Sequence, residues 1–115
     1  MFILTIITFI TLVFLTLFFV FTPIRICGDS MHPTLIDGDV YFTLRVSKLH
    51  KFKEGDIYVY RTPYDKSKYA VKRLISSQGH YLFFEGDNKK VSYDSRHYGC
   101  ISPKQVKFRV LKRKE

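Results

Sequence analysis

The first 24 residues of the chain contain no charged side chain and consist mainly of Phe, Ile, Leu, Val and Thr. As an α-helix, the first 22 of them would span about 33 Å, which matches the ~30 Å hydrocarbon core of a bilayer. A cleaved signal peptide would instead show a basic start, a shorter apolar run and small residues at the cleavage site. The sequence therefore predicts a retained transmembrane anchor over residues 1–24 and one small domain over residues 25–115.

Every charged side chain follows this anchor, so the net charge of +9 belongs to the predicted domain. A charge of this sign is typical of proteins that bind nucleic acid or anionic lipid. Because the domain is tethered to a membrane, we expect membrane lipid rather than nucleic acid as its partner. A solvated basic surface that keeps a small domain soluble explains the charge equally well.

Beyond the anchor, short segments rich in Val, Ile, Tyr and Phe are separated by Gly, Pro, Asp and Ser, as is typical of strands and turns. We expect strands at 39–46, 56–61, 69–76, 81–85 and 106–111, loops at 48–53 and 62–68, and a charged, frayed end at 111–115. Closely spaced strands without crossover helices favour a mainly β fold, here a small antiparallel barrel-like sheet.

The cysteines and histidines do not show the spacing of metal ligands, so we expect neither a metal site nor a cofactor. Cys27 and Cys100 are far apart in the sequence. A disulfide between them is permitted outside the cytoplasm but is not implied.

Ser30 follows a Gly-Asp turn directly after the anchor and is a candidate nucleophile. A serine hydroxyl needs a base within hydrogen-bond reach, and no His-Asp pair accompanies this one. Lys72 lies in a predicted strand in which it shares a face with Ala70 and Leu74. Burial between them would lower the lysine pKa from ~10.4 and make the amine a usable base. The alternative is an exposed lysine whose stem covers apolar surface.

Three segments of the chain stand in a fixed order: Ser-Met-His-Pro-Thr at 30–34, Lys-Arg at 72–73, and Gly-Asp-Asn at 86–88 followed by Ser-Tyr-Asp-Ser-Arg at 92–96. In this order they resemble the motifs of the type I signal peptidases, which are membrane-bound serine proteases with a Ser/Lys dyad. The resemblance covers roughly residues 28–99. A lysine at position 72, where the endoplasmic reticulum branch has histidine, is similar to the bacterial and mitochondrial branch.

The resemblance implies a role for each matching residue. Ser30 would be the nucleophile and Lys72 the general base, and the Ser92 hydroxyl would orient the lysine amine. Asp94 would pair with Arg96 to brace the site.

For the oxyanion, we expect the Ser30 N–H as a donor, with Gly28 allowing the substrate backbone to approach. Met31 is a candidate for the lining of the substrate pocket. The chain departs from many members after Lys72-Arg73, where Gly-x-Pro-Gly-Asp is absent, and residues 79–86 leave no room for a large inserted subdomain.

Together these features predict a membrane-bound serine endopeptidase that removes signal peptides from exported preproteins. The resemblance implies a catalytic domain on the extracytoplasmic side of a membrane. We expect the cell membrane of a bacterium, with the mitochondrial inner membrane as the second choice. The positive-inside rule taken alone favours the opposite orientation, although it weakens for long segments.

The main alternative is a catalytically silent relative that assists the assembly of pilins or other surface proteins. A self-cleaving repressor or a nucleic-acid-binding barrel fits less well because of the anchor. The sequence does not indicate an oligomeric state.

Overall fold

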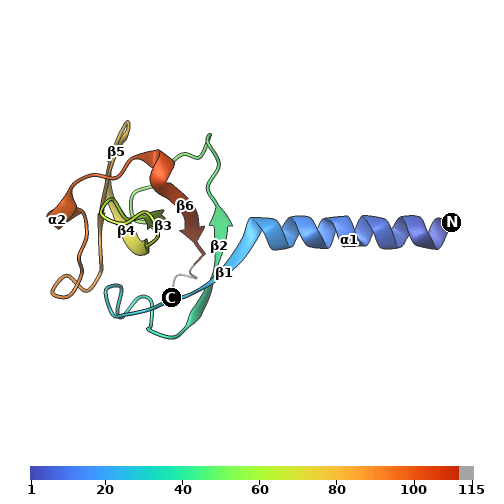
Figure 1. Cartoon of the computed structure of the whole chain (residues 1–115), viewed down its shortest axis with the longest axis horizontal. Coiled ribbons are helices and arrows are strands. Elements are labelled where there is room, and N and C mark those ends of the chain that lie inside the picture. Colours follow the sequence, from blue (N-terminus) through green and yellow to red (C-terminus); the bar gives the residue numbers. More distant parts are fainter. Residues whose placement is uncertain (112–115) are drawn as a thin grey trace.

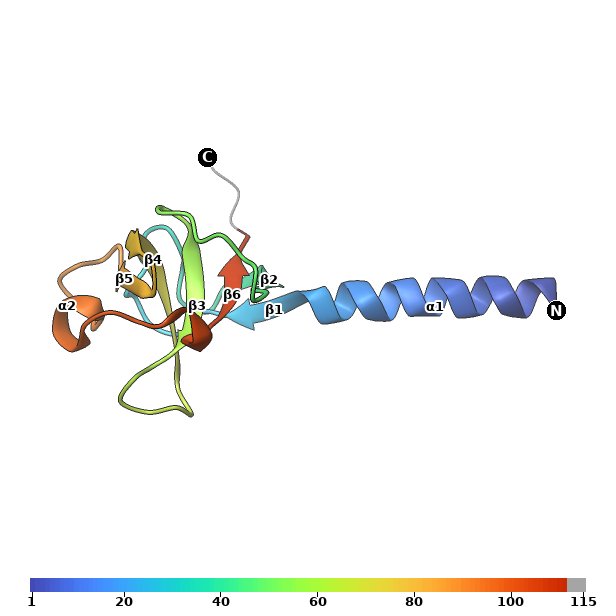
Figure 2. The same cartoon turned by 90° about the horizontal axis from the view of Figure 1, so that it is seen from above.

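The structure is a computed structural model that describes residues 1–111 of the chain. A single helix, α1 (Phe2–Val20), extends away from a small β domain and carries the N-terminus at its far end (Figures 1 and 2). None of its residues is buried, and by length and composition it is able to cross a membrane. The charged end predicted at 111–115 lies, apart from Leu111, outside the described residues.

The helix ends four residues before the predicted boundary of the anchor, and strand β1 (Phe21–Arg25) continues directly from it. β1 pairs antiparallel with β2 (Val40–Arg45). The run of apolar residues gives no sign of this change, but Pro23 does. Proline lacks an N–H and disfavours helical geometry in the residue before it, so helices usually end before it.

The remaining strands are β3 (Ile57–Arg61), β4 (Tyr69–Gln78), β5 (Tyr81–Glu85) and β6 (Val106–Val110), with short helices α2 (Ser95–Tyr98) and η1 (Pro103–Gln105) before β6. The six strands form one antiparallel sheet in the order β1-β2-β6-β3-β4-β5. Within residues 1–111 no ladder joins β5 to β1, so the sheet is open there. The predicted antiparallel β fold behind one apolar helix is confirmed, as are the loops at 48–53 and 62–68.

The central strand β3 is buried on both faces. Tyr58 and Tyr60 belong to one apolar cluster, which also contains Leu74, Leu82, Phe84, Ile101 and Val106. Ile57 and Val59 belong to a second cluster, with Ile26, Met31, Leu35 and Val110. This two-sided burial explains why β3 has no polar alternation. Its neighbour β4 contributes Leu74 to the first cluster and packs Val71 against the second.

Candidate active site

A cavity of about 520 Å³ beside β4 is lined by both Ser30 and Lys72. Other lining side chains are mostly apolar or aromatic and come from β1, β3, β4, β6 and the segments next to them: Ile24, Ile26, Met31, Val59, Tyr64, Tyr69, Ala70, Val71, Val91, Tyr93 and Phe108. Arg25 and Cys27 complete the lining. The fold thus brings the predicted nucleophile and the predicted base, which are far apart in the sequence, to one cavity.

The loop after β1 carries Ser30 and is fixed at both sides of it. Before the serine, the Gly28 N–H donates to the Asp37 carboxylate at 2.8 Å. Gly28 has a φ of +93°, a conformation that favours glycine over any residue with a side chain. After the serine, Met31 and Leu35 are fully buried in the second cluster. Ser30 itself is half-buried, so it lies at the edge of a well-packed loop.

The turn of residues 86–88, which follows β5, holds this loop through its backbone. The Asn88 N–H donates to the Ser30 carbonyl at 2.9 Å, and the Asn88 side-chain amide donates to the Asp29 carbonyl at 3.0 Å. The Asp87 N–H points to the Met31 sulfur at 3.4 Å. Three successive residues of the serine loop are therefore positioned by one turn.

Gly86 marks the closest approach between this turn and the site. A Cβ atom at this position would lie 2.2 Å from the Ser92 Oγ and 2.6 Å from the Ser30 carbonyl oxygen. These distances are far below van der Waals contact, so a larger residue cannot be accommodated without displacing backbone. The glycine of the Gly-Asp-Asn motif is thus required by packing.

Asp87 connects the serine loop to the lysine strand. Its carboxylate accepts two hydrogen bonds from the Arg73 guanidinium, at 2.8 and 2.7 Å, and one from the Thr34 hydroxyl at 2.5 Å. The Arg73 hydrogen bond is the main reason that the pKa of Asp87 is lowered. Sequence reasoning had assigned no role to either residue. The signal was present, because Arg73 directly follows Lys72 and Asp87 is the acid of the Gly-Asp-Asn motif.

Lys72 is 6% exposed and pairs across the sheet with Tyr58. Its strand neighbours on the same face are Ala70, half-buried, and Leu74, fully buried, as the alternation predicted. The alternative of an exposed strand lysine is wrong. Burial lowers the pKa of Lys72; the charge of Asp94 opposes this effect and that of Arg96 adds to it. Within residues 1–111 the Lys72 amine makes no hydrogen bond.

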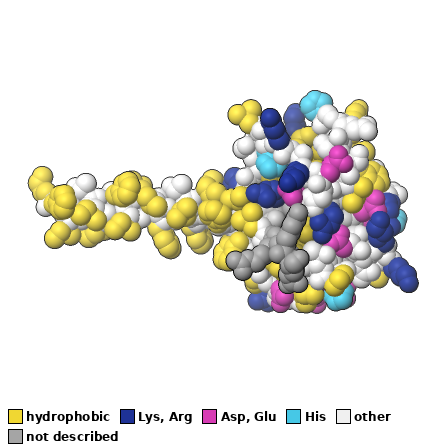
Figure 3. Space-filling model, turned by 180° about the vertical axis from the view of Figure 1, so that it is seen from behind, with side chains coloured by type: hydrophobic (Ala, Val, Ile, Leu, Met, Phe, Trp, Pro, Cys, Tyr) yellow, Lys and Arg dark blue, Asp and Glu magenta, His cyan; other side chains and the backbone are white. Residues whose placement is uncertain are grey.

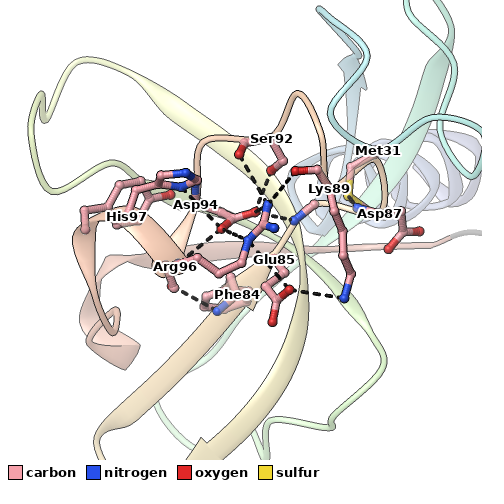
Figure 4. Close-up of polar contacts among 12 residues, drawn as sticks. Met31, Phe84, Glu85, Asp87, Lys89, Ser92, Asp94, Arg96 and His97 are labelled. Carbon is pink, nitrogen blue, oxygen red and sulfur yellow. Dashed lines mark hydrogen bonds and ion pairs between the residues drawn. The ribbon is translucent and has the colours of Figure 1, made fainter.

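Asp94 is fully buried and accepts hydrogen bonds from three directions (Figure 4). They come from the Arg96 Nε at 2.9 Å, the Ser92 hydroxyl at 2.7 Å and the Gly86 N–H at 2.8 Å. Burial alone would raise the pKa of Asp94, but these hydrogen bonds, above all those from Arg96 and Ser92, outweigh it and lower the pKa. The Asp94–Arg96 ion pair is thus present, at 2.9 Å, and directly follows Tyr93, which lines the cavity.

The Ser92 hydroxyl is directed to Asp94. In the described part of the chain no hydrogen bond joins Ser92 to Lys72, so an orienting role for this serine stays a prediction. The catalytic roles of Ser30 and Lys72 and the oxyanion role of the Ser30 N–H are predictions of the same kind.

Cys27 and Cys100 are both exposed free thiols. Across residues 1–111, His, Cys, Asp and Glu side chains do not gather into a group that could hold a metal ion.

The chain is similar to known membrane proteases. Residues 1–80 match the family described as signal peptidase, peptidase S26. Mitochondrial inner membrane protease subunit 1 of Mus musculus is 28% identical over 105 residues, which cover 73% of this chain and 63% of the mouse protein. Signal peptidase I P of Bacillus subtilis subsp. natto is 40% identical over 78 residues, which cover 67% of this chain and 42% of the bacterial protein. The chain spans less than two thirds of each of these relatives.

Proposed function

Since the chain belongs to the signal peptidase family, peptidase S26, we propose that it is a membrane-bound serine endopeptidase that removes signal peptides from preproteins with Ser30 as nucleophile and Lys72 as base. The observation that carries this proposal is the shared cavity, which Ser30 and a buried Lys72 both line. A base for a serine must be neutral at working pH, and burial shifts Lys72 in that direction.

In the proposed reaction, the neutral Lys72 amine takes the Ser30 proton as the hydroxyl oxygen attacks the scissile carbonyl. The proton passes to the leaving amine when the peptide bond breaks, and the same amine then activates water to release the acyl group. The Ser30 N–H would donate to the developing oxyanion. Its carbonyl is held by Asn88, which fixes the peptide on the other side of the residue.

The family resemblance implies a substrate with small side chains next to the cut, and the mostly apolar lining of the cavity favours uncharged ones. Met31 is fully buried and touches the Gly-Asp-Asn turn through its sulfur, so it would form part of the floor rather than a mobile wall. We propose that residues 92, 94 and 96 act by positioning.

The site also lies close to the membrane. Ser30 follows the last residue of α1 by ten residues, so even an extended chain keeps it within about 35 Å of the helix end. A signal peptide that spans the same bilayer would emerge at a similar level. We propose that residues 25–115 form the catalytic domain on the extracytoplasmic side.

The proposal is tested by incubating the full chain in detergent with a preprotein. Ser30→Ala should abolish cleavage, while Ser47→Ala, which removes an exposed hydroxyl outside the cavity, should leave it unchanged. Lys72→Arg should be as inactive as Lys72→Met, because a guanidinium stays protonated at working pH. Cleavage by Lys72→Arg would show that another group takes the serine proton.

Two further outcomes bear on the rest of the proposal. A wild-type chain that binds preprotein without cutting it would favour the silent assembly factor. Protease added outside intact cells should digest the domain, and protection until lysis would reverse the proposed topology.

A further inference from the structure

A second cavity, of about 700 Å³, lies apart from Ser30 and Lys72 between the end of β2, the loop that follows it, and the η1–β6 segment. Its floor is apolar and includes Val46, Phe52 and Val106. Val106 is buried and Phe52 packs against the first apolar cluster, so the floor is continuous with the core. We call this cavity the basic groove because of the side chains at its rim.

Five basic residues line the groove: Arg45, Lys48, His80, Lys104 and Lys107. No acidic residue lines it. Among residues 1–111, none of these five side chains forms an ion pair with a carboxylate, although several other basic residues of the domain do. The positive charge of the groove is therefore not balanced within the described part of the chain, and it is suited to an anion.

The groove is joined to the membrane helix through Arg45. The Arg45 guanidinium lies over the ring of Phe19, in the last turn of α1, with 4.4 Å to the ring centroid. The same group also lies 5.6 Å from the ring of Phe108 in β6. When α1 spans a bilayer, Arg45 must lie at the level where the helix leaves the hydrocarbon core. Figure 3 shows Lys and Arg side chains where the apolar helix meets the domain.

The local backbone fixes part of the rim. η1 is capped by Ser102, whose hydroxyl accepts from the Lys104 N–H at 3.4 Å, and the Lys107 amine donates to the Lys104 carbonyl at 3.2 Å. The Val46 N–H donates to the Lys107 carbonyl at 2.9 Å. Hydrogen bonds to the backbone thus join the two sides of the groove, and the backbone positions from which the lysine side chains extend are fixed.

From the unbalanced charge, the apolar floor and the contact with α1, we propose that the basic groove binds the phosphate headgroup of an anionic phospholipid from the surrounding leaflet. The phosphate would lie among the rim cations, and the glycerol and first acyl carbons would cover the apolar floor. A bound lipid would fix the orientation of the domain on the membrane surface. The proposal does not depend on the protease activity.

The test uses the whole 115-residue chain carrying Ser30→Ala in nanodiscs, to avoid self-digestion. The lipids are phosphatidylcholine doped with a photoreactive phosphatidylglycerol or, in a parallel sample, photoreactive phosphatidylcholine. After irradiation, mass spectrometry of peptides locates the cross-links. Cross-links of phosphatidylglycerol to residues 45–52 and 102–107 are expected, in clear excess over those of phosphatidylcholine. Equal labelling by both lipids would overturn the proposal.

A pair of charge-matched variants separates the groove from general attraction. Lys48, Lys104 and Lys107 are changed together to Gln in one, and the exposed Lys66, Lys68 and Lys90, which do not line the groove, are changed to Gln in the other. At about fivefold per basic residue near an anionic surface, removal of the three charges should lower cross-linking by roughly a hundredfold. The control variant should change by less than about twofold.

The remaining outcomes are equally decisive. Equal losses of cross-linking in the two variants would mean that the net charge of the domain, and not the groove, attracts the lipid. Unchanged cross-linking in both variants would mean that the three groove lysines do not bind the lipid. Added glycerol phosphate should not compete at concentrations below those of general salt screening. Specific competition by it would assign the groove to a soluble phosphate and overturn the lipid assignment.

Discussion

Replacing Lys72 by Met removes a buried amine while it keeps the approximate length of the side chain. Burial lowers the pKa of Lys72, which is 6% exposed, so the folded protein holds the ammonium form less favourably than the unfolded chain does. Each unit by which the pKa is lowered corresponds to about 1.4 kcal/mol of stability lost at a pH below the folded-state pKa. Met carries no such penalty. We therefore expect Lys72→Met to raise the free energy of unfolding at neutral pH.

The pH dependence of this difference follows from proton binding. Between the lowered pKa of the folded state and ~10.4 in the unfolded chain, the unfolded state binds more protons, so the wild-type protein becomes more stable as the pH rises. The slope is at most about 1.4 kcal/mol per pH unit. Because Lys72→Met lacks this slope, its advantage over the wild type should be full below the folded-state pKa and shrink as the pH approaches about 10.

The measurement is denaturant unfolding of the full chain in detergent micelles over a series of pH values, with the difference between variant and wild type taken at each. Lys90→Met, which removes one charge from an exposed position, is the control for net charge. A difference for Lys72→Met that stays constant across the series would refute the reasoning. It would mean that the folded and unfolded states bind the Lys72 proton equally well, and the amine would then be an unsuitable base.

Three shorter predictions concern the surroundings of the site. Gly86→Ala should lower the free energy of unfolding by about 1–3 kcal/mol and impair preprotein cleavage, because its Cβ would collide with the Ser92 side chain. Asp87→Asn should cost about 1.5–3 kcal/mol at neutral pH by weakening the charged hydrogen bonds with Arg73, and this loss should disappear as the pH falls through the lowered pKa of Asp87. A bulky maleimide on Cys27 should block cleavage, because this exposed thiol lines the cavity.

Each of these predictions has an internal comparison. Cys100 is also an exposed free thiol but does not line the cavity, so labelling a Cys27→Ser variant should leave cleavage intact. Inhibition that persists in that variant would place the effect elsewhere. For Gly86→Ala, thermal unfolding equal to that of the wild type would contradict the packing argument. For Asp87→Asn, a stability loss that does not change with pH would show that the charge of Asp87 is not its cause.

The sequence predicts those features that depend on local pattern. The five predicted strands coincide closely with β2 to β6, because each has β-branched or aromatic residues bounded by turn residues. The same pattern places Lys72 on one face with Ala70 and Leu74 but leaves an exposed lysine as the alternative, and the motif resemblance is what favours a buried base. In a strand, residues two apart share a face, and Ala70 and Leu74 mark that face as apolar.

Features that depend on pairing between distant segments are not predicted. The sequence predicts β1 as part of the apolar anchor, because its apolar residues suit either structure. Pro23 marks only that a helix ends nearby, and the strand itself is defined by its register with β2. The contact of Asp87 with Arg73 requires β5 to lie beside β4, and that neighbourhood is set by the sheet order. Local composition contains neither piece of information.

The contacts around Asp94 link the candidate nucleophile to a carboxylate that never touches it. Asp94 accepts from the Gly86 N–H and the Ser92 hydroxyl, and Gly86 packs against the Ser30 carbonyl. Because Asp94 is buried, a variant that removes its carboxylate, such as Asp94→Ala, leaves the donors without a partner, which costs more than the hydrogen bonds themselves contributed. The turn that holds Ser30 would then loosen. The arrangement of the site therefore rests on polar contacts made by side chains outside the dyad. Together with the Asp87–Arg73 contact, which reaches β4, they can hold the serine loop and β4 in a fixed relation before any substrate binds.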